Sequence, residues 1–176
     1  MIKETRIVDD TTGEVKYRQT QHIAAAFQED KGYLFWARKS FAKSFLDIPY
    51  PESMTDIEIG RMARLAKKML ANTNMLGYRS NNRTRPMDAA RIGKELGLKH
   101  RQSKKFVDKM IRLGMIAKVT VLTEKDKVIQ YYINPIYFFS SNRIPLNLYL
   151  IFQVQLDRHL PEWVRDEFAK QSKASQ

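Results

Sequence analysis

One stretch, from Asp88 to Ile133, restricts the fold more than any other part of the sequence. Residues 88–97 predict a short helix, because apolar side chains recur on one face and Gly97 suits the left-handed conformation that ends a helix. A second helix is predicted to begin near His100 and to close at Gly114. Two helices joined by a tight turn predict a helix-turn-helix.

Two β-strands are predicted directly after the second helix. Residues 115–122 and 128–133 read as strands with alternating side chains, and the polar residues 123–127 supply the turn between them. Asn134-Pro135 ends the second strand, because proline cannot donate a hydrogen bond to a ladder. The order helix, turn, helix and hairpin predicts a winged helix, in which the hairpin lies beside the helix that enters a DNA groove.

The second helix of this pair has one apolar face and one strongly polar face. Its polar face carries long hydrogen-bond donors, which suit phosphate oxygens and guanine edges. We expect the region from Arg101 to Lys105 to enter the major groove, where Gln102 suits adenine and an arginine or lysine suits guanine. Whether His100 contacts DNA or is an ordinary turn residue stays open. The candidate DNA-binding residues of this helix are His100, Arg101, Gln102, Lys104, Lys105, Lys109 and Arg112.

Further basic residues are candidates for contacts with the phosphate backbone. In the polar connection that precedes the two helices, contact with the phosphate backbone and a loop that makes no such contact are equally favoured. The segment from Arg79 through Arg112 contains eleven basic and three acidic residues, so it carries +8 of the net charge of +12. Such a concentration predicts a polyanionic partner, and we expect double-stranded DNA. The backbone candidates outside the second helix are Arg83 and Arg85 in the connection and the wing lysines Lys125 and Lys127.

An earlier helix is predicted from a capping box at Thr55-Asp-Ile-Glu58. Met54 and Ile59 stand where a hydrophobic staple would fix the entry of the chain. An apolar stripe then continues to about Asn72, which predicts the first helix of the winged-helix domain.

The N-terminal residues predict β-structure. Residues 6–9 and 14–17 flank the turn-like residues 10–13, which predicts a hairpin, and residues 32–36 form an aromatic, strand-like segment. The basic and aromatic residues 36–45 have two interpretations. They either bind single-stranded nucleic acid by stacking or pack in an aromatic core, and the second interpretation is favoured.

The C-terminal residues predict a helix that must bury an apolar face. Pro145 is placed at its start, with Ser141 or Asn142 as caps, and Pro161 is expected to break or restart the helix. The apolar face either closes the core of its own domain or pairs with a second copy. We favour a homodimer through this C-terminal helix.

The sequence gives no sign of catalysis. Cysteine is absent, which excludes disulfides and thiolate zinc sites and fits a reducing compartment. The histidines His22, His100 and His159 stand far apart and form no metal-binding motif, and no phosphate-binding glycine loop, nucleophile elbow or dinucleotide fingerprint occurs. We therefore expect a protein that is not an enzyme, without metal or cofactor.

No apolar run of membrane-spanning length and no signal-peptide pattern occurs in the sequence. We accordingly expect a cytoplasmic protein with no membrane partner.

At several short motifs the chain resembles the RepL-type replication proteins of plasmids and phages in Gram-positive bacteria. These motifs cover most of the chain in the same order. They are the Thr12-Gly-Glu14 element, the Ile59 to Leu70 helix leading to Asn74, the Ile92 to Leu98 helix and turn, the Met110 to Ile116 join of helix to strand, and Tyr132-Ile-Asn-Pro135 leading to an aromatic segment.

This resemblance implies a winged-helix protein that binds a replication origin and recruits host proteins, without its own nicking or ATPase activity. The second predicted helix is richer in lysine and arginine than its counterpart in that family. A phage-type transcriptional regulator on the same fold, recruiting transcription proteins, is one alternative function. A non-catalytic scaffold whose basic face meets an acidic protein is an alternative of another class.

The sequence thus predicts an α+β protein with three parts. Residues 1–50 form an N-terminal β-rich extension, residues 54–135 form a winged helix-turn-helix core that binds DNA, and residues 136–176 form a C-terminal helical extension.

Overall fold

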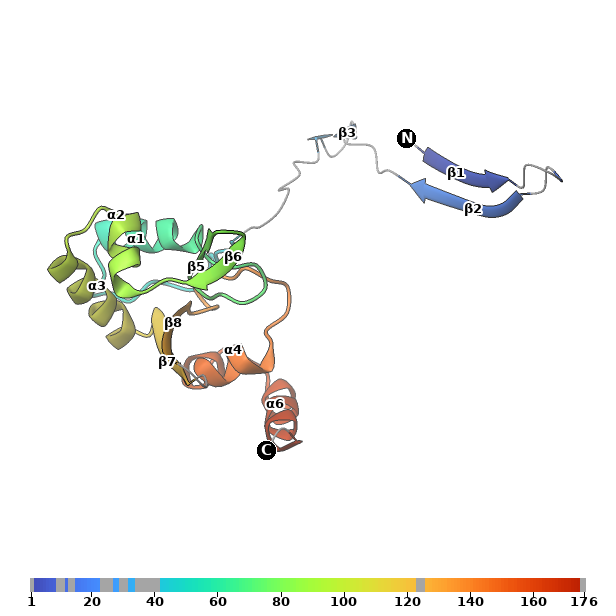
Figure 1. Ribbon diagram of the computed structural model, residues 1–176. Helices are drawn as coiled ribbons and strands as arrows, with labels where there is room; N and C mark the ends of the chain where they lie inside the picture. The colour runs from blue at the N-terminus through green and yellow to red at the C-terminus, as the bar shows by residue number, and fades with distance from the viewer. Residues whose placement is uncertain are drawn as a thin grey trace. The chain divides into compact units, whose positions relative to one another are not determined.

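The computed structural model divides the chain into two units, Met1–Arg38 and Lys39–Gln176 (Figure 1). It describes residues 2–8, 12, 15–22, 27–28, 32–33, 42–122 and 126–174. Helices and small antiparallel sheets are mixed, so the predicted α+β class is confirmed.

The described residues of the first unit form two small antiparallel pairs of strands. Strands β1 (Ile2–Val8) and β2 (Val15–His22) pair along their length, with one irregularity between Ile7 and Val8. The predicted N-terminal hairpin is therefore confirmed. Strands β3 (Phe27–Gln28) and β4 (Gly32–Tyr33) form the second pair. Residues 34–36 of the predicted aromatic strand lie outside the described residues.

The second unit begins its helices with α1 (Asp56–Ala66). The predicted capping box is confirmed, because the Glu58 amide donates to the Thr55 hydroxyl at 3.3 Å and the Thr55 amide donates to the Glu58 carboxylate at 2.9 Å. The predicted end near Asn72 is wrong. The chain leaves the helix after Ala66 and reverses through Asn72, whose φ of 64° is incompatible with a right-handed helix.

Helices α2 (Ala89–Leu96) and α3 (His100–Arg112) follow as predicted. Asp88 caps α2 by accepting a hydrogen bond from the Arg91 amide at 2.6 Å. Gly97 ends α2 with a φ of 68°, a conformation in which a side chain would be strained. The turn between the two helices is thus set by its glycine.

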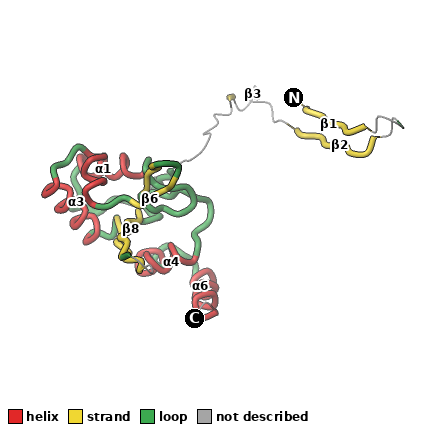
Figure 2. The backbone as a smooth tube through the Cα atoms, viewed as in Figure 1, coloured by secondary structure: helices red, strands yellow, loops and turns green. Residues whose placement is uncertain are grey.

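Strands β7 (Ile116–Leu122) and β8 (Lys127–Ile133) form the predicted hairpin after α3. Because alternate residues point to opposite faces, Tyr131 packs in the core beneath α3, whereas Tyr132 packs against the C-terminal helices. The hairpin lies between these two groups of helices (Figure 2). It therefore belongs to both apolar cores of the second unit.

The polar connection before α2 is a hairpin rather than a loop. Strands β5 (Gly77–Ser80) and β6 (Arg83–Pro86) pair only with each other, through a turn at Asn81 and Asn82 with φ of 49° and 59°. Asparagine tolerates this left-handed conformation, as two-residue hairpin turns require. The segment before β5 contacts the β7–β8 hairpin through a short antiparallel bridge from Met75 to Tyr132.

Three short helices end the chain: α4 (Leu146–Ile151), α5 (Gln153–Leu156) and α6 (Glu162–Ala174). The predicted caps at Ser141 and Asn142 are wrong, because Pro145 occupies the cap position of α4 and makes no side-chain hydrogen bond there. The predicted restart after Pro161 is confirmed. Leu148, Phe152 and Leu156 are buried in the core of this region, which corresponds to the first of the two expected alternatives, whereas Trp163 is exposed.

Candidate nucleic-acid interface

Helix α3 separates a buried face from a charged one. Ser103, Phe106, Val107 and Met110 are buried on one side. On the opposite side four exposed residues recur at helical spacing, at i, i+4, i+7 and i+11. We call these the outer row of α3: Arg101, Lys105, Asp108 and Arg112. The row extends roughly 16 Å along the helix.

The cations of this surface are not neutralised within the described part of the chain. No hydrogen bond or ion pair joins the side chains of Arg101, Lys105 and Arg112 to another described residue. The carboxylate of Glu95, on helix α2, instead pairs with Lys68 at 2.9 Å and with Arg91 at 3.3 Å. Positive charge therefore stays concentrated on the outward side of the helix.

The side chains of two further predicted residues of α3 also lack partners within the described part of the chain. His100 and Lys104 are exposed beside the outer row. Gln102 is also exposed, but its Oε1 accepts a hydrogen bond from the Lys99 amide at 3.1 Å and so helps to cap the helix. A bidentate contact with adenine uses both amide atoms, so that predicted contact would require this cap to open.

Helix α3 is held against α2 by an unusually close approach at Gly93. The Ser103 hydroxyl donates to the Ala89 carbonyl at 2.5 Å. A Cβ atom added at Gly93 would stand 2.7 Å from the Ser103 Cβ atom, closer than side chains tolerate. This contact fixes how α3 is presented.

Replacing Gly93 with alanine is expected to destabilise the second unit by about 1 to 3 kcal/mol, because the added methyl group overpacks the helix pair. Gly60 is the matched control, since it also lies inside a helix but has no atom within 4 Å of an added Cβ. Gly60→Ala should stabilise by roughly 0.5 to 1 kcal/mol. Urea denaturation followed by circular dichroism measures both, and equal effects would refute the close packing.

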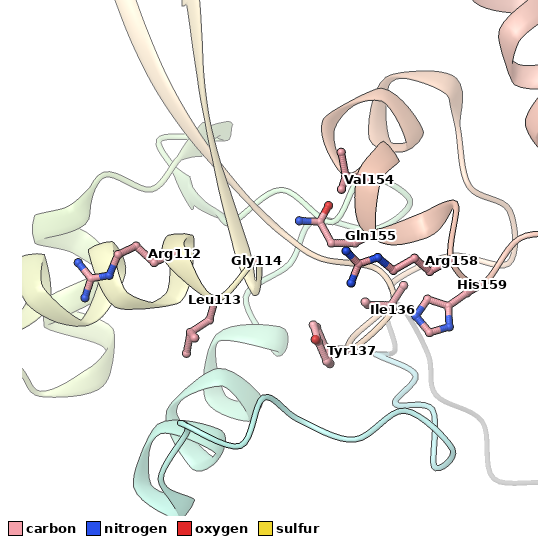
Figure 3. Close-up of a pocket in the computed structure, with 9 residues that line it drawn as sticks. All are labelled: Arg112, Leu113, Gly114, Ile136, Tyr137, Val154, Gln155, Arg158 and His159. Carbon is pink, nitrogen blue, oxygen red and sulfur yellow. The ribbon is translucent and has the colours of Figure 1, made fainter.

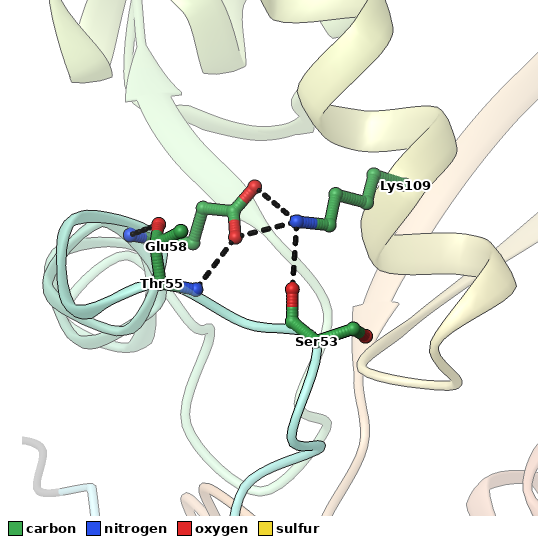
Figure 4. A network of polar contacts seen from close by, with 4 residues as sticks. All are labelled: Ser53, Thr55, Glu58 and Lys109. Carbon is green, nitrogen blue, oxygen red and sulfur yellow. Dashed lines mark hydrogen bonds and ion pairs between the residues drawn. The ribbon is translucent and has the colours of Figure 1, made fainter.

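Lys109 points toward α1 rather than along the outer row (Figure 4). Its ammonium group donates to both carboxylate oxygens of Glu58, at 2.8 and 2.7 Å, and to the Ser53 carbonyl at 2.9 Å. Partial burial raises the pKa of Glu58, but hydrogen bonds from Lys109 and Thr55 outweigh it and lower that pKa overall. The predicted phosphate contact of Lys109 competes with this tie and stays a prediction.

Lys109→Ala is expected to cost about 1.5 to 3 kcal/mol of folding stability, because it leaves a charged, largely buried carboxylate without its main partner. The lowered pKa of Glu58 contributes stability at pH values above its ordinary 4.5, and this contribution is lost as the pH falls through the folded value. Lys109→Ala should therefore also flatten the loss of stability below about pH 4.5.

Arg112→Ala is the control for this pair, because Arg112 is an exposed cation on the same helix. Its effect on stability should stay within about 0.5 kcal/mol. Thermal and urea denaturation between pH 3 and 7 compare the two variants. Equal stability of both at pH 7 would contradict the structural role of Lys109.

The remaining candidates lie on the two hairpins. Arg83 and Arg85 are exposed on β6, where Arg85 pairs across the strands with Tyr78. Lys127 is exposed at the start of β8, opposite Leu122. Lys125 lies outside the described residues. The structure thus places Lys127 on the β7–β8 hairpin but leaves the two arginines on a separate hairpin.

Lys118 is an exposed cation that the candidate residues did not include. It lies on the same face of the β7–β8 hairpin as Lys127 and Tyr131. Burial raises the pKa of Tyr131, and the negative charges of Asp108 and Asp88 raise it further, so this face is on the side of α3. The alternation of side chains along the predicted strand around Lys118 could have identified this residue from the sequence.

A pocket of about 270 Å³ lies beyond the C-terminal end of α3 (Figure 3). Arg158 and His159 line it together with apolar residues. Arg112 also lines this pocket, although Figure 3 shows its guanidinium group extending away from Gln155 and Arg158. The pocket therefore adjoins the outer row at Arg112.

The described residues offer neither a cluster of metal ligands nor a membrane-spanning helix. Within them, no group of three or more acidic or histidine side chains is arranged to hold a metal ion. Their helices are all too short or too polar to cross a lipid bilayer.

Comparisons of this chain with protein-family models, with curated proteins and with solved structures found no significant match.

Proposed function

We propose that this protein binds double-stranded DNA in a sequence-specific manner through α3, in the manner of a winged helix. The observation that supports this most directly is the outer row of α3, whose cations lack partners among the described residues on a helix fixed by its buried face. An unneutralised row of long cationic side chains is complementary to DNA phosphates and to guanine edges.

In this proposal α3 lies in the major groove, which is wide enough for a helix. Arg101, in the first turn, contacts a guanine edge, and Lys104 and Lys105 contact bases or adjoining phosphates. Lys127 and Lys118 reach phosphates from the hairpin that stands in the position of a wing. The arginines of β6 would extend the basic surface along the backbone.

Replication initiation at a plasmid or phage origin is the role we favour, because of the resemblance to RepL-type proteins. Transcriptional regulation on the same fold is the second candidate. Host replication or transcription proteins are the further partners in this proposal, and the cytoplasm is its location. Pairing of two chains would suit a palindromic site, and the exposed Leu150, Val154 and Trp163 of the C-terminal helices offer apolar surface for it.

Fluorescence anisotropy tests this proposal with duplex fragments that tile the protein's own gene and flanking DNA, at two salt concentrations and with unlabelled random competitor. A specific fragment should bind about a thousandfold or more tightly than random duplex. The position of that fragment would locate the site, and a site over a promoter would favour a regulator. Uniform, steeply salt-dependent binding would contradict specificity. Absence of binding, together with retention on an acidic protein, would favour a scaffold.

A further inference from the structure

Asp108 is the acidic residue in the outer row of α3. Its carboxylate is exposed and lies between Lys105 and Arg112, three and four residues away. These spacings commonly allow ion pairs on a helix. Within the described residues, however, the Asp108 side chain makes no hydrogen bond or ion pair. The exposed carboxylate thus lies between cations without pairing with either of them.

Intrinsic helix propensity does not explain an aspartate at this position. Aspartate has a low helix propensity, and a negative charge in the C-terminal half of a helix interacts unfavourably with the helix dipole. Two other acidic side chains near α3 have a different environment. Glu58 and Glu95 are mostly shielded from solvent and bonded to lysines.

On a DNA-binding face, a carboxylate has a defined chemistry. Phosphate oxygens repel it, so it weakens binding to every sequence alike. The cytosine N4 amino group is the one base edge in the major groove that donates without an adjacent acceptor on the same base, and carboxylates accept from it. A single carboxylate among cations therefore lowers the affinity for every DNA sequence and increases the discrimination between sequences.

We propose that Asp108 accepts a hydrogen bond from a cytosine N4 amino group and thereby specifies a C·G pair in the target of this protein. The inference rests on the DNA-binding function proposed above. Arg101 and Asp108 are separated by seven residues, or roughly 10 Å along the helix, which corresponds to about three base-pair steps. The two residues would specify opposite ends of one short half-site.

The test selects bound duplexes from a random-sequence pool with the full-length protein and with its Asp108→Asn and Asp108→Ala variants. Affinities are then measured for the selected duplex, for its single base-pair changes and for random duplex. The wild-type protein should prefer C·G at one position by roughly tenfold or more, and both variants should lose that preference at that position alone.

The variants should also bind random duplex about two- to fivefold more tightly, because a repulsive charge has been removed from the interface. Asp166→Asn is the matched control, since it removes an exposed acidic charge from α6. That variant should change neither base preference nor affinity for random duplex. An increase in affinity on removing a charged residue distinguishes Asp108 from every cation of α3.

Three results would overturn the inference. An unchanged base preference in both Asp108 variants, combined with lower thermal stability, would show that Asp108 only relieves repulsion among the cations. An equal loss of affinity for all sequences would show a general structural role. If the wild-type protein binds no duplex, the proposed function and this inference fail together, whereas loss of binding in Arg101→Ala with intact preference in Asp108→Ala overturns the inference alone.

Discussion

Replacing Arg101 and Lys105 together with alanine is expected to lower affinity for the specific duplex by on the order of 10² to 10³-fold. Each side chain that contacts a base edge supplies about 1 to 3 kcal/mol of discrimination. Both residues are exposed in the outer row and lack partners among the described residues, so their loss leaves folding almost unaffected. The reduction should therefore appear in binding and not in thermal stability.

The matched control for this pair is Arg143→Ala combined with Lys173→Ala. These residues are also exposed, and their removal lowers the net charge by the same amount. Anisotropy titrations against specific and random duplexes separate the two cases. The control pair should change affinity for both duplexes only slightly. If both pairs weaken binding equally, net charge rather than α3 drives association, and the docking described above is wrong.

The second large effect is expected at Asn74, which is completely buried. Its side-chain nitrogen donates to the Ile133 carbonyl at 2.9 Å and to the Phe138 carbonyl at 2.7 Å. Its side-chain oxygen accepts from the amide and the hydroxyl of Ser140, at 2.9 and 3.0 Å. One amide thus joins the end of β8 to the segment that leads to the C-terminal helices.

Asn74→Ala is expected to destabilise the second unit by about 3 to 4 kcal/mol, because it leaves several buried backbone groups without partners. Asn72→Ala is the control, since Asn72 shares the positive φ but is exposed. The control should cost only about 1 to 2 kcal/mol, the strain of a left-handed alanine. Urea denaturation at 222 nm reports on both, and similar losses would show that backbone strain, not the hydrogen-bond network, explains Asn74.

Local signals in the sequence were sufficient for the elements around the candidate interface. The Thr55 to Glu58 spacing marks a helix start because the two side chains cap it reciprocally. Gly97 marks the turn between α2 and α3 because a left-handed residue is required there. These features depend on neighbours within a few residues, so a sequence alone contains them.

Other features depend on contacts between distant residues or on packing. Met69 and Leu70 continue the apolar spacing of α1, yet they follow its end, where Met69 is buried in the core and Leu70 is half-buried. The β5–β6 hairpin has few apolar side chains. The one local indication of a hairpin in its sequence is the Asn81-Asn82 turn. The tie from Lys109 to Glu58 joins residues 51 positions apart, which no local pattern reveals.

The measurement that tests the central claim most directly is methylation interference on the bound fragment. Methylation at guanine N7 blocks the major groove, where α3 is proposed to lie. With the wild-type protein, guanines at the site should be depleted of N7 methylation in the bound fraction. With Arg101→Ala, the depletion should disappear at one guanine and persist at the others. Bound DNA that tolerates N7 methylation throughout would contradict the placement of α3 in the major groove.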